Sequence, residues 1–180
     1  MEQLRIFKVV VVGDSAVGKT SLSMRYATNT FQYEYIKTIG SNFFLRDLQV
    51  DDQQTRLLIW DLAGDEFFGQ IRFLFYQGSF GAMMVFDVTR RITFEHLSGW
   101  LKELNKNIEW NIPIIMAANK TDSEEWEINQ SEIEQYAENA GFPLFLTSAM
   151  TDQNVIAAFN RLATEITGVV IQIEDSSTPL

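Results

Sequence analysis

The 180-residue chain contains no cysteine and a single histidine, which limits the kinds of chemistry that its side chains can perform. Without cysteine the chain can form no disulfide, offer no thiolate nucleophile and carry no prenyl or palmitoyl group within these residues. The histidine, His96, follows Thr93 among polar neighbours, and no motif needs it. We therefore expect His96 to be a surface residue without a catalytic role.

Long apolar runs and basic residues are also scarce. No run approaches the 18 residues of a membrane-spanning helix, and the N-terminus lacks a secretory signal pattern, so we expect a cytoplasmic protein. The chain has 14 Lys and Arg against 24 Asp and Glu, a net charge of −10. This charge argues against non-specific binding to nucleic acid or to anionic membranes.

The most informative segment that is present is residues 13–20, Gly-Asp-Ser-Ala-Val-Gly-Lys-Thr, directly after the apolar run 7–12. Between a strand and a helix, this spacing is typical of a phosphate-binding loop. Its glycines let backbone N–H groups point at phosphate oxygens, and the helix adds its positive end. Lys19 is expected to reach the outer phosphates and Thr20 to ligate Mg²⁺. The expected nucleotide-binding residues of this segment are Gly13, Ser15, Ala16, Val17, Gly18, Lys19, Thr20 and Ser21.

Strand and helix patterns alternate along the rest of the chain. Short apolar runs occur at about 5–12, 82–88, 112–118 and 143–147, and residues 42–50 and 55–61 have the pattern of a hairpin. Apolar residues at helical spacing lie between them: Phe94, Leu97, Leu101 and Leu104; Ile133, Tyr136 and Ala137; Val155, Phe159, Leu162 and Ile166.

This alternation predicts a three-layer α/β fold that binds ligands at the carboxyl ends of its strands. No repeat, low-complexity tract or linker divides the chain. We expect one domain over 1–167 and a short tail over 168–180, frayed from 175 onward.

Residues 119–122, Asn-Lys-Thr-Asp, follow a strand pattern and indicate the base. The Asp122 carboxylate is an acceptor only, and it can pair with the N1–H and 2-amino groups of guanine. Adenine offers neither donor, and an unpaired buried carboxylate costs more than ~1–3 kcal/mol, so an ATP-using kinase is disfavoured. The stem of Lys120 can lie over the purine face beside Asn119. Backbone N–H groups at Ser148 and Ala149, also after a strand pattern, can bind guanine O6.

Two further segments complete the expected metal and γ-phosphate site. Asp61 ends a strand pattern in the segment Trp-Asp-Leu-Ala-Gly, where its carboxylate can hold Mg²⁺ through water and the Gly64 N–H can meet a γ-phosphate. Thr38, in the loop 35–40, can supply a second hydroxyl to the metal. The expected Mg²⁺ residues are therefore Thr20, Thr38 and Asp61.

With these motifs in this order, residues 5–167 resemble the Ras superfamily of small GTPases and, within it, the Rab family. Rab-like segments are 39–43 (Ile-Gly-Ser-Asn-Phe), 58–61 (Leu-Ile-Trp-Asp), 75–78 (Phe-Tyr-Gln-Gly) and 87–89 (Asp-Val-Thr). The resemblance implies a P-loop NTPase fold with a six-stranded, mostly parallel sheet, one antiparallel strand and helices on both faces. It also implies a molecular switch that binds GDP and GTP with Mg²⁺ and hydrolyses GTP, with a switch I over 31–40 and a switch II over 64–77.

The same resemblance assigns residues to roles. It places Phe31 beside the base and Tyr35 over the phosphates, and it assigns hydrolysis to Lys19, Thr38, Gly64 and residue 65. It makes Ile39, Phe43, Trp60 and Phe75 an effector contact, although the three aromatic residues could instead be half-buried sheet residues. The implied partners of this monomer are effectors in membrane traffic or signalling, an exchange factor and a GTPase-activating protein, which could place it at membranes.

The chain departs from the family pattern at three places. Asp65 stands where a Gln usually orients the attacking water; it is shorter and charged, which predicts slow intrinsic hydrolysis, although a carboxylate can accept hydrogen bonds from water. The alternative is a GTP-bound interaction scaffold that is nearly inert in hydrolysis. Met150 stands where a Lys usually packs on the base, which Met can partly replace. No cysteine lies near the C-terminus, so either the usual Rab lipid anchor is not used or the sequence is trimmed.

Overall fold

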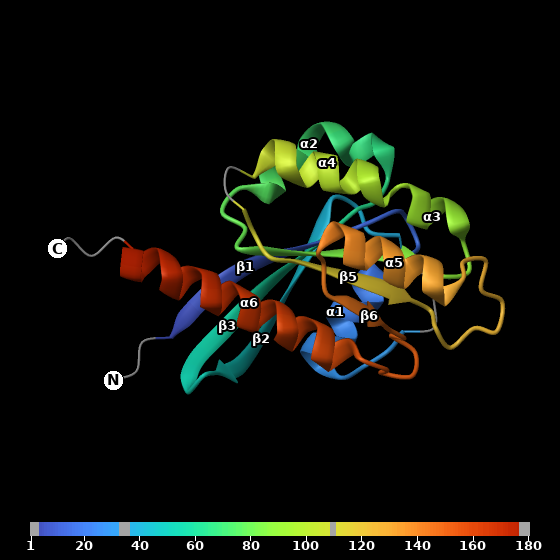
Figure 1. Cartoon of the computed structure of the whole chain (residues 1–180). Helices are drawn as coiled ribbons and strands as arrows, with labels where there is room; N and C mark the ends of the chain where they lie inside the picture. The colour runs from blue at the N-terminus through green and yellow to red at the C-terminus, as the bar shows by residue number, and fades with distance from the viewer. Residues whose placement is uncertain (1–3, 33–36, 109–110, 177–180) are drawn as a thin grey trace.

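A sheet with helices on both sides makes up the molecule (Figure 1). The structure is a computed structural model, and it describes residues 4–32, 37–108 and 111–176, with the backbone alone described for 169–176. In chain order its elements are β1 (Arg5–Val12), α1 (Lys19–Thr28), β2 (Ser41–Val50), β3 (Gln53–Leu62), the 3₁₀ helix η1 (Glu66–Phe68), α2 (Gly69–Tyr76), β4 (Gly81–Asp87), α3 (Arg91–Glu95), α4 (Leu97–Asn107), β5 (Ile114–Asn119), α5 (Gln130–Ala140), β6 (Leu144–Leu146) and α6 (Val155–Ser176).

The sheet has the strand order β2-β3-β1-β4-β5-β6. Only β2 runs antiparallel to its neighbour, and the other paired strands are parallel. The β2–β3 hairpin turns at Asp51 and Asp52, both of which adopt positive φ angles. The predicted six-stranded, mostly parallel sheet with one antiparallel strand is confirmed.

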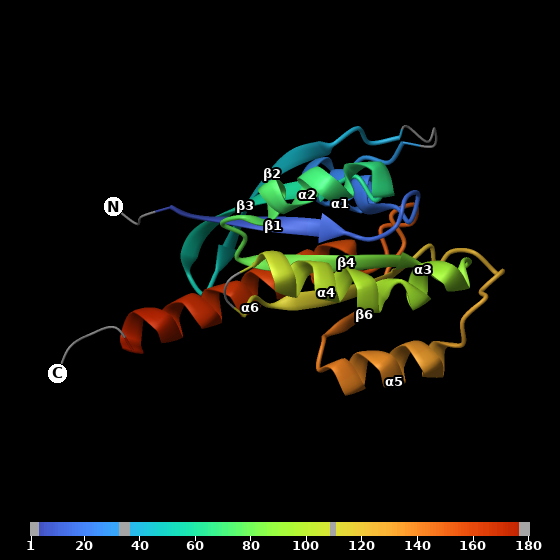
Figure 2. The ribbon, with the colours of Figure 1, turned by 90° about the horizontal axis from the view of Figure 1, so that it is seen from above.

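Each face of the sheet is covered by its own set of helices. Leu22 and Tyr26 of α1 pack with Phe159 of α6 against one face, and the Tyr26 and Phe159 rings stack at 4.4 Å. Residues of α2, α3, α4 and α5 cover the other face. Figures 1 and 2 show α2 and α4 together on the side opposite α6. Strands buried on both faces must be apolar throughout, which is why β1, β4 and β5 were recognisable as near-continuous apolar runs.

Two helices differ from the sequence-based expectation. The expected tail is helical through Ser176, because α6 continues past residue 167 and meets no proline before Pro179. Fraying from residue 175 is therefore wrong for 175–176, while 177–180 lie outside the described residues; the domain boundary at 167 stays a prediction. The apolar face from Phe94 to Leu104 belongs to two helices, α3 and α4, which meet at His96.

The parallel strands bring the predicted motifs to one edge of the sheet. The loop 13–18 follows β1, Asp61 lies near the end of β3, and Asn119 is the last residue of β5. Because parallel strands share their carboxyl edge, segments about 100 residues apart in the chain become neighbours there.

Candidate functional site

The loop between β1 and α1 has a backbone that only glycine permits at two positions. Gly13 has a φ of +141°, and a Cβ there would lie 2.0 Å from the carbonyl oxygen of Val85. Gly18, with a φ of +100°, caps the N-terminus of α1, and a Cβ there would lie 2.2 Å from Nδ2 of Asn119. The loop is thus packed directly against β4 and the end of β5.

Lys19 is enclosed by this loop. It is 5% exposed, and its Nζ donates to the carbonyl oxygens of Gly13 (2.8 Å) and Asp14 (2.7 Å). Burial lowers the pKa of Lys19 to about 8, although Asp61 and Asp14 oppose this shift. A buried ammonium group held only by neutral carbonyl oxygens is a suitable partner for an anionic ligand such as a phosphate.

The three residues predicted to hold a metal ion converge. The Oγ1 atoms of Thr20 and Thr38 are 2.9 Å apart, and Thr20 donates to Oδ2 of Asp61 at 2.5 Å. Thr38 Oγ1 lies 3.4 Å from the same carboxylate oxygen. Burial raises the pKa of Asp61, and its second oxygen, Oδ1, is buried without a hydrogen-bond partner. Hard oxygen ligands and an unsatisfied carboxylate oxygen are a donor set that fits Mg²⁺.

A pocket beside the loop brings most of the predicted phosphate-site residues together. Its lining residues include Ser15, Ala16, Gly18, Lys19, Thr20, Ser21, Phe31, Thr38, Gly64, Asp65 and Lys120. Gly13 and Val17 are not among the lining residues, and Val17 is part of the core. Tyr35, predicted to cover the phosphates, lies outside the described residues. Most residues predicted to bind the phosphates, two of the three predicted to hold the metal, and Lys120, predicted to lie over the base, therefore share one concave surface.

The rest of the predicted base site is joined to this pocket through hydrogen bonds. Asn119 Nδ2 donates to the carbonyl oxygen of Val17 at 2.8 Å, which links the base motif to the phosphate loop. Ser148 Oγ donates to Oδ1 of Asp122 at 2.5 Å, which links that motif to the loop after β6. Ala149 is buried and Met150 is 43% exposed, and neither they nor Asp122 line the pocket itself.

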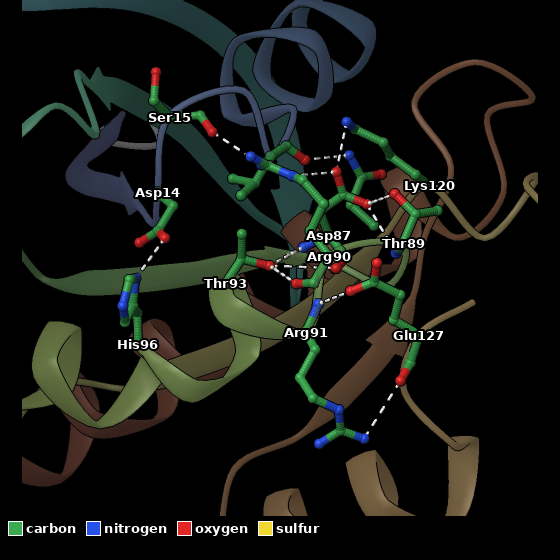
Figure 3. A network of polar contacts seen from close by, with 12 residues as sticks. Asp14, Ser15, Asp87, Thr89, Arg90, Arg91, Thr93, His96, Lys120 and Glu127 are labelled. Atoms are coloured by element: carbon green, nitrogen blue, oxygen red, sulfur yellow. Dashed lines mark hydrogen bonds and ion pairs between the residues drawn. The ribbon is translucent and has the colours of Figure 1, made fainter. Parts of the chain in front are cut away.

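Sequence reasoning assigned no role to Asp87 or Arg90, and Figure 3 shows that they connect the two motifs. Oδ2 of the buried Asp87 accepts from Lys120 Nζ (2.6 Å) and Arg90 Nε (3.0 Å), and Arg90 Nη2 donates to the carbonyl oxygen of Ser15 (2.9 Å). Burial opposes ionisation of Asp87, but hydrogen bonds from Lys120 and Thr89 hold its pKa below the usual value. Asp87 lies in the Rab-like segment 87–89, and this resemblance is the one sequence signal that points to it.

His96 lies at the surface, as expected, but it also makes a contact that the sequence did not predict. Its Nδ1 lies 2.7 Å from Oδ2 of Asp14 in the phosphate loop, although the side chain is 53% exposed (Figure 3). Trp100 of α4 donates from Nε1 to the other carboxylate oxygen of Asp14 at 2.8 Å. His96 thus helps to tie the loop to α4, a contact between residues 82 apart that no local pattern reveals.

Arg25 is a second residue that sequence reasoning missed. From α1, its Nε donates to the carbonyl oxygen of Ala149 at 2.8 Å, and its Nη2 donates to that of Met150 at 3.0 Å. Its guanidinium also lies 5.7 Å from the centre of the Phe31 ring. Arg25 therefore supports both the loop expected at guanine O6 and the ring expected beside the base.

Both oxygens of the Asp65 carboxylate are engaged. Oδ1 accepts from the Phe67 N–H at 2.9 Å and caps η1, while Oδ2 pairs with Lys37 Nζ at 2.6 Å. The hydrogen bond from Lys37, followed by that from Phe67, holds the pKa of Asp65 below the usual range. Asp65 is therefore an anion that joins the segment around residue 37 to the segment 64–77.

The predicted effector residues lie on one surface but differ in exposure. Ile39 and Phe43 are 81% and 65% exposed, whereas Trp60 and Phe75 are partly buried against the core. The ring centres of Phe43 and Trp60 are 6.3 Å apart, and those of Trp60 and Phe75 are 5.7 Å apart. The three rings form one continuous aromatic strip across β2, β3 and α2.

Within the described residues, no helix is long and apolar enough to cross a membrane. In that same part of the chain, no group of three or more His, Cys, Asp or Glu side chains could hold a metal ion.

A phosphate loop at the end of β1 and a guanine motif at the end of β5 occur together in P-loop proteins that bind GTP, and this chain is one of them. It belongs to the Ras family, whose family model matches residues 8–168. The relatives it matches carry Rab-type names, and the chain is a Rab-like small GTPase, as the sequence resemblance predicted.

Three such relatives come from green plants and algae. Ras-related protein YPTC6 of Chlamydomonas reinhardtii is 40% identical over 166 residues, which cover 92% of this chain and 77% of the relative. Ras-related protein RABA4a of Arabidopsis thaliana is 40% identical over 166 residues, which cover 92% of this chain and 74% of the relative. Ras-related protein Rab11A of Lotus japonicus is 39% identical over 170 residues, which also cover 92% of this chain and 74% of the relative.

Proposed function

We propose that this Rab-like GTPase is a guanine-nucleotide switch whose intrinsic GTP hydrolysis is slow because Asp65 is held away from the role of orienting water. Family membership gives the coarser function: a small GTPase that works with effectors, exchange factors and GTPase-activating proteins. The observation that carries the finer proposal is the double engagement of the Asp65 carboxylate by Lys37 and Phe67.

The nucleotide and metal roles rest on the site geometry. Lys19 and the N–H groups of the phosphate loop bind the phosphates, while Asn119, Lys120 and Asp122 bind guanine. Thr20, Thr38 and Asp61 would hold Mg²⁺, which when bound neutralises charge on the outer phosphates. Because Thr38 and Gly64 line the same pocket, GTP would order both switches around its γ-phosphate.

Asp65 is poorly suited to activate water for two reasons. An ionised carboxylate only accepts hydrogen bonds, whereas a Gln amide both accepts and donates, and here both carboxylate oxygens already have donors. A carboxylate about 5 Å from a γ-phosphate also costs up to about 3 kcal/mol per pair of like charges at an effective dielectric near 20. Lys37 offsets part of this repulsion, but only while it stays paired with Asp65.

The aromatic strip, exposed at Phe43 and partly buried at Trp60 and Phe75, supports effector binding next to the switches. Ile39 in switch I and Phe43 just after it present apolar surface, and Trp60 and Phe75 continue it to α2. Exposed aromatic side chains between two nucleotide-dependent loops are suitable anchors for a partner protein. Such partners would bring the monomeric GTPase to membranes.

Single-turnover GTP hydrolysis of the wild type and Asp65→Gln, with nucleotide affinity measured in parallel, tests the proposal. We expect Asp65→Gln to hydrolyse GTP at least ~10-fold faster, a difference of about 1.4 kcal/mol in the barrier. Asp65→Asn is the matched control, because it removes the charge and keeps the length. An unchanged or lower rate for Asp65→Gln would show that Asp65 is a competent substitute.

The alternative function is a GTP-bound scaffold with no useful hydrolysis. The same engagement of Asp65 favours it to the extent that Lys37 remains bound in the GTP form. A wild type that does not turn over GTP faster than buffer, although Asp65→Gln does, would favour the scaffold.

A further inference from the structure

The only described arginine with a nearly buried side chain lies within switch II. Arg72 of α2 is 5% exposed, and its guanidinium forms a bidentate pair with Glu103 of α4, with Nε–Oε1 at 2.8 Å and Nη2–Oε2 at 3.1 Å. The guanidinium carbon also lies 4.5 Å from the centre of the Trp100 ring. Two hydrogen bonds and a stacked ring fix the plane of this group, because arginine presents its donors in a rigid fork.

The anchor on α4 is itself held in place. Glu103 Oε1 also accepts from the Tyr76 hydroxyl at 2.8 Å. Burial opposes its ionisation, but the hydrogen bonds from Arg72 and Tyr76 hold the pKa of Glu103 below the usual value. Trp100 in turn donates to Asp14 of the phosphate loop at 2.8 Å. Helix α4 thus supports switch II through Glu103 and the phosphate loop through Trp100.

The third guanidinium nitrogen of Arg72, Nη1, is directed at the backbone around Gly64. Nη1 donates to the carbonyl oxygens of Ala63 (3.0 Å) and Asp65 (2.9 Å), the residues on either side of that glycine. The Ala63 carbonyl and the Gly64 N–H belong to one planar trans peptide, so they point in opposite directions. When Arg72 holds the carbonyl, it also fixes the direction of the Gly64 N–H.

The same peptide has little room to move. The Ala63 N–H, which belongs to the preceding peptide between Leu62 and Ala63, donates to the carbonyl oxygen of Gly40 at 2.9 Å and ties that peptide to the end of switch I. A Cβ on Gly64 would lie 2.3 Å from the Gly13 carbonyl oxygen, so this backbone lies against the phosphate loop. The remaining freedom is rotation of the peptide plane, which the bond from Arg72 restrains.

We propose that Arg72 is a positioning residue that aims the Gly64 N–H at the γ-phosphate and so sets the preference for GTP over GDP. This inference rests on the proposed function as a guanine-nucleotide switch. GDP has no γ-phosphate, so loss of Arg72 costs GTP binding while GDP binding is kept. A donor that is already oriented needs no rearrangement when the ligand arrives, which increases its contribution to binding.

The test measures the affinities of GDP and of a slowly hydrolysed GTP analogue for each purified variant with Mg²⁺, by displacement of a fluorescent nucleotide. Arg72→Met removes the donors but keeps an apolar stem over Trp100. We expect its analogue affinity to fall ~10-fold or more relative to GDP, with GDP affinity within ~3-fold of the wild type. Glu103→Gln keeps Arg72 but removes its paired charge, so a smaller fall in the same ratio is expected. Arg161→Met is the control, because Arg161 pairs with Glu165 on the exposed side of α6 and should leave the ratio unchanged.

The outcomes separate this inference from the proposed function. A wild-type chain that binds neither nucleotide overturns both. A wild-type chain that binds both, with Arg72→Met and Glu103→Gln at the wild-type ratio, overturns the role of Arg72 alone. An equal loss of GDP and analogue affinity also overturns it, because it indicates a general packing role. If melting of the GDP-bound form shows that Arg72→Met does not fold, Glu103→Gln and Arg72→Lys replace it. The ratio of analogue affinity to GDP affinity in these two variants then tests the inference, and a wild-type ratio in both overturns it.

Discussion

At the scale of single residues, Asp122 should determine which base is bound. Its carboxylate is oriented by the Ser148 hydroxyl at 2.5 Å, so it is available in a defined position for the two donors of guanine. We expect GDP and GTP to bind at nanomolar levels or tighter with Mg²⁺, and ATP at least ~10³-fold more weakly. Asp122→Asn should shift the preference toward xanthine nucleotides, because a C2 carbonyl needs a donor.

Competition binding with GTP, ATP and XTP measures this preference. Glu124→Gln is a matched control, since it removes one acidic charge from the same exposed loop. Similar affinities for ATP and GTP in the wild type would contradict the assignment of the guanine motif.

Contacts between residues far apart in the sequence could not be predicted from local sequence patterns. The phosphate loop and the guanine motif could be predicted because each is a run of adjacent residues with its own chemistry. The contacts of Arg90 with Ser15 and of Arg72 with Glu103 join residues 75 and 31 positions apart. An arginine that stabilises a backbone carbonyl from another element looks, in the sequence, like any surface arginine.

At the scale of elements, the two switches should respond to the nucleotide through Thr38. Its hydroxyl lies within hydrogen-bond distance of both Thr20 and Asp61 and can take part in binding the triphosphate with Mg²⁺. Thr38→Ala should leave GDP affinity nearly unchanged and weaken ordering by GTP. Amide hydrogen exchange over residues 31–45 and 64–77 should slow when GDP is replaced by a GTP analogue, and less so in Thr38→Ala.

Thr164→Ala on α6 is a suitable control, because its hydroxyl bonds only to the Asn160 carbonyl oxygen of its own helix among the described contacts. Equal exchange in the GDP and analogue states of the wild type would show a fixed scaffold instead of a switch.

Elements also differ in how well the sequence specified them. Strands β1, β4 and β5 are buried on both faces, so their apolar runs were sufficient to predict them. The end of α6 was not predictable from the apolar face at 155–166, because the helix continues past that face and meets no proline before Pro179. The break between α3 and α4 falls at His96, whose side chain contacts Asp14 of the phosphate loop, and the apolar spacing contains no sign of either feature.

At the scale of the whole molecule, charge should decide how the chain behaves at a lipid surface. The 180 residues carry a net charge of −10 and no lipidatable cysteine. Anionic lipids repel such a surface, so we expect no co-sedimentation with anionic liposomes in either the GDP or the GTP-analogue state. Neutral liposomes are the control for repulsion, and nucleotide-dependent pelleting of the purified chain would reveal a membrane-binding surface.

The shared edge of β1, β3 and β5 has a thermodynamic consequence for the whole chain. The pocket is lined by segments that are far apart in the sequence and meet only at the edge of the folded sheet, so the unfolded chain does not contain it. A ligand that binds only the folded form adds stability that grows with the logarithm of its concentration, about 4 kcal/mol at 1,000 times its Kd. Bound GTP or GDP would then contribute to the free energy of unfolding in the cell. A partner protein that releases the nucleotide would have to supply a similar stabilisation through its own contacts.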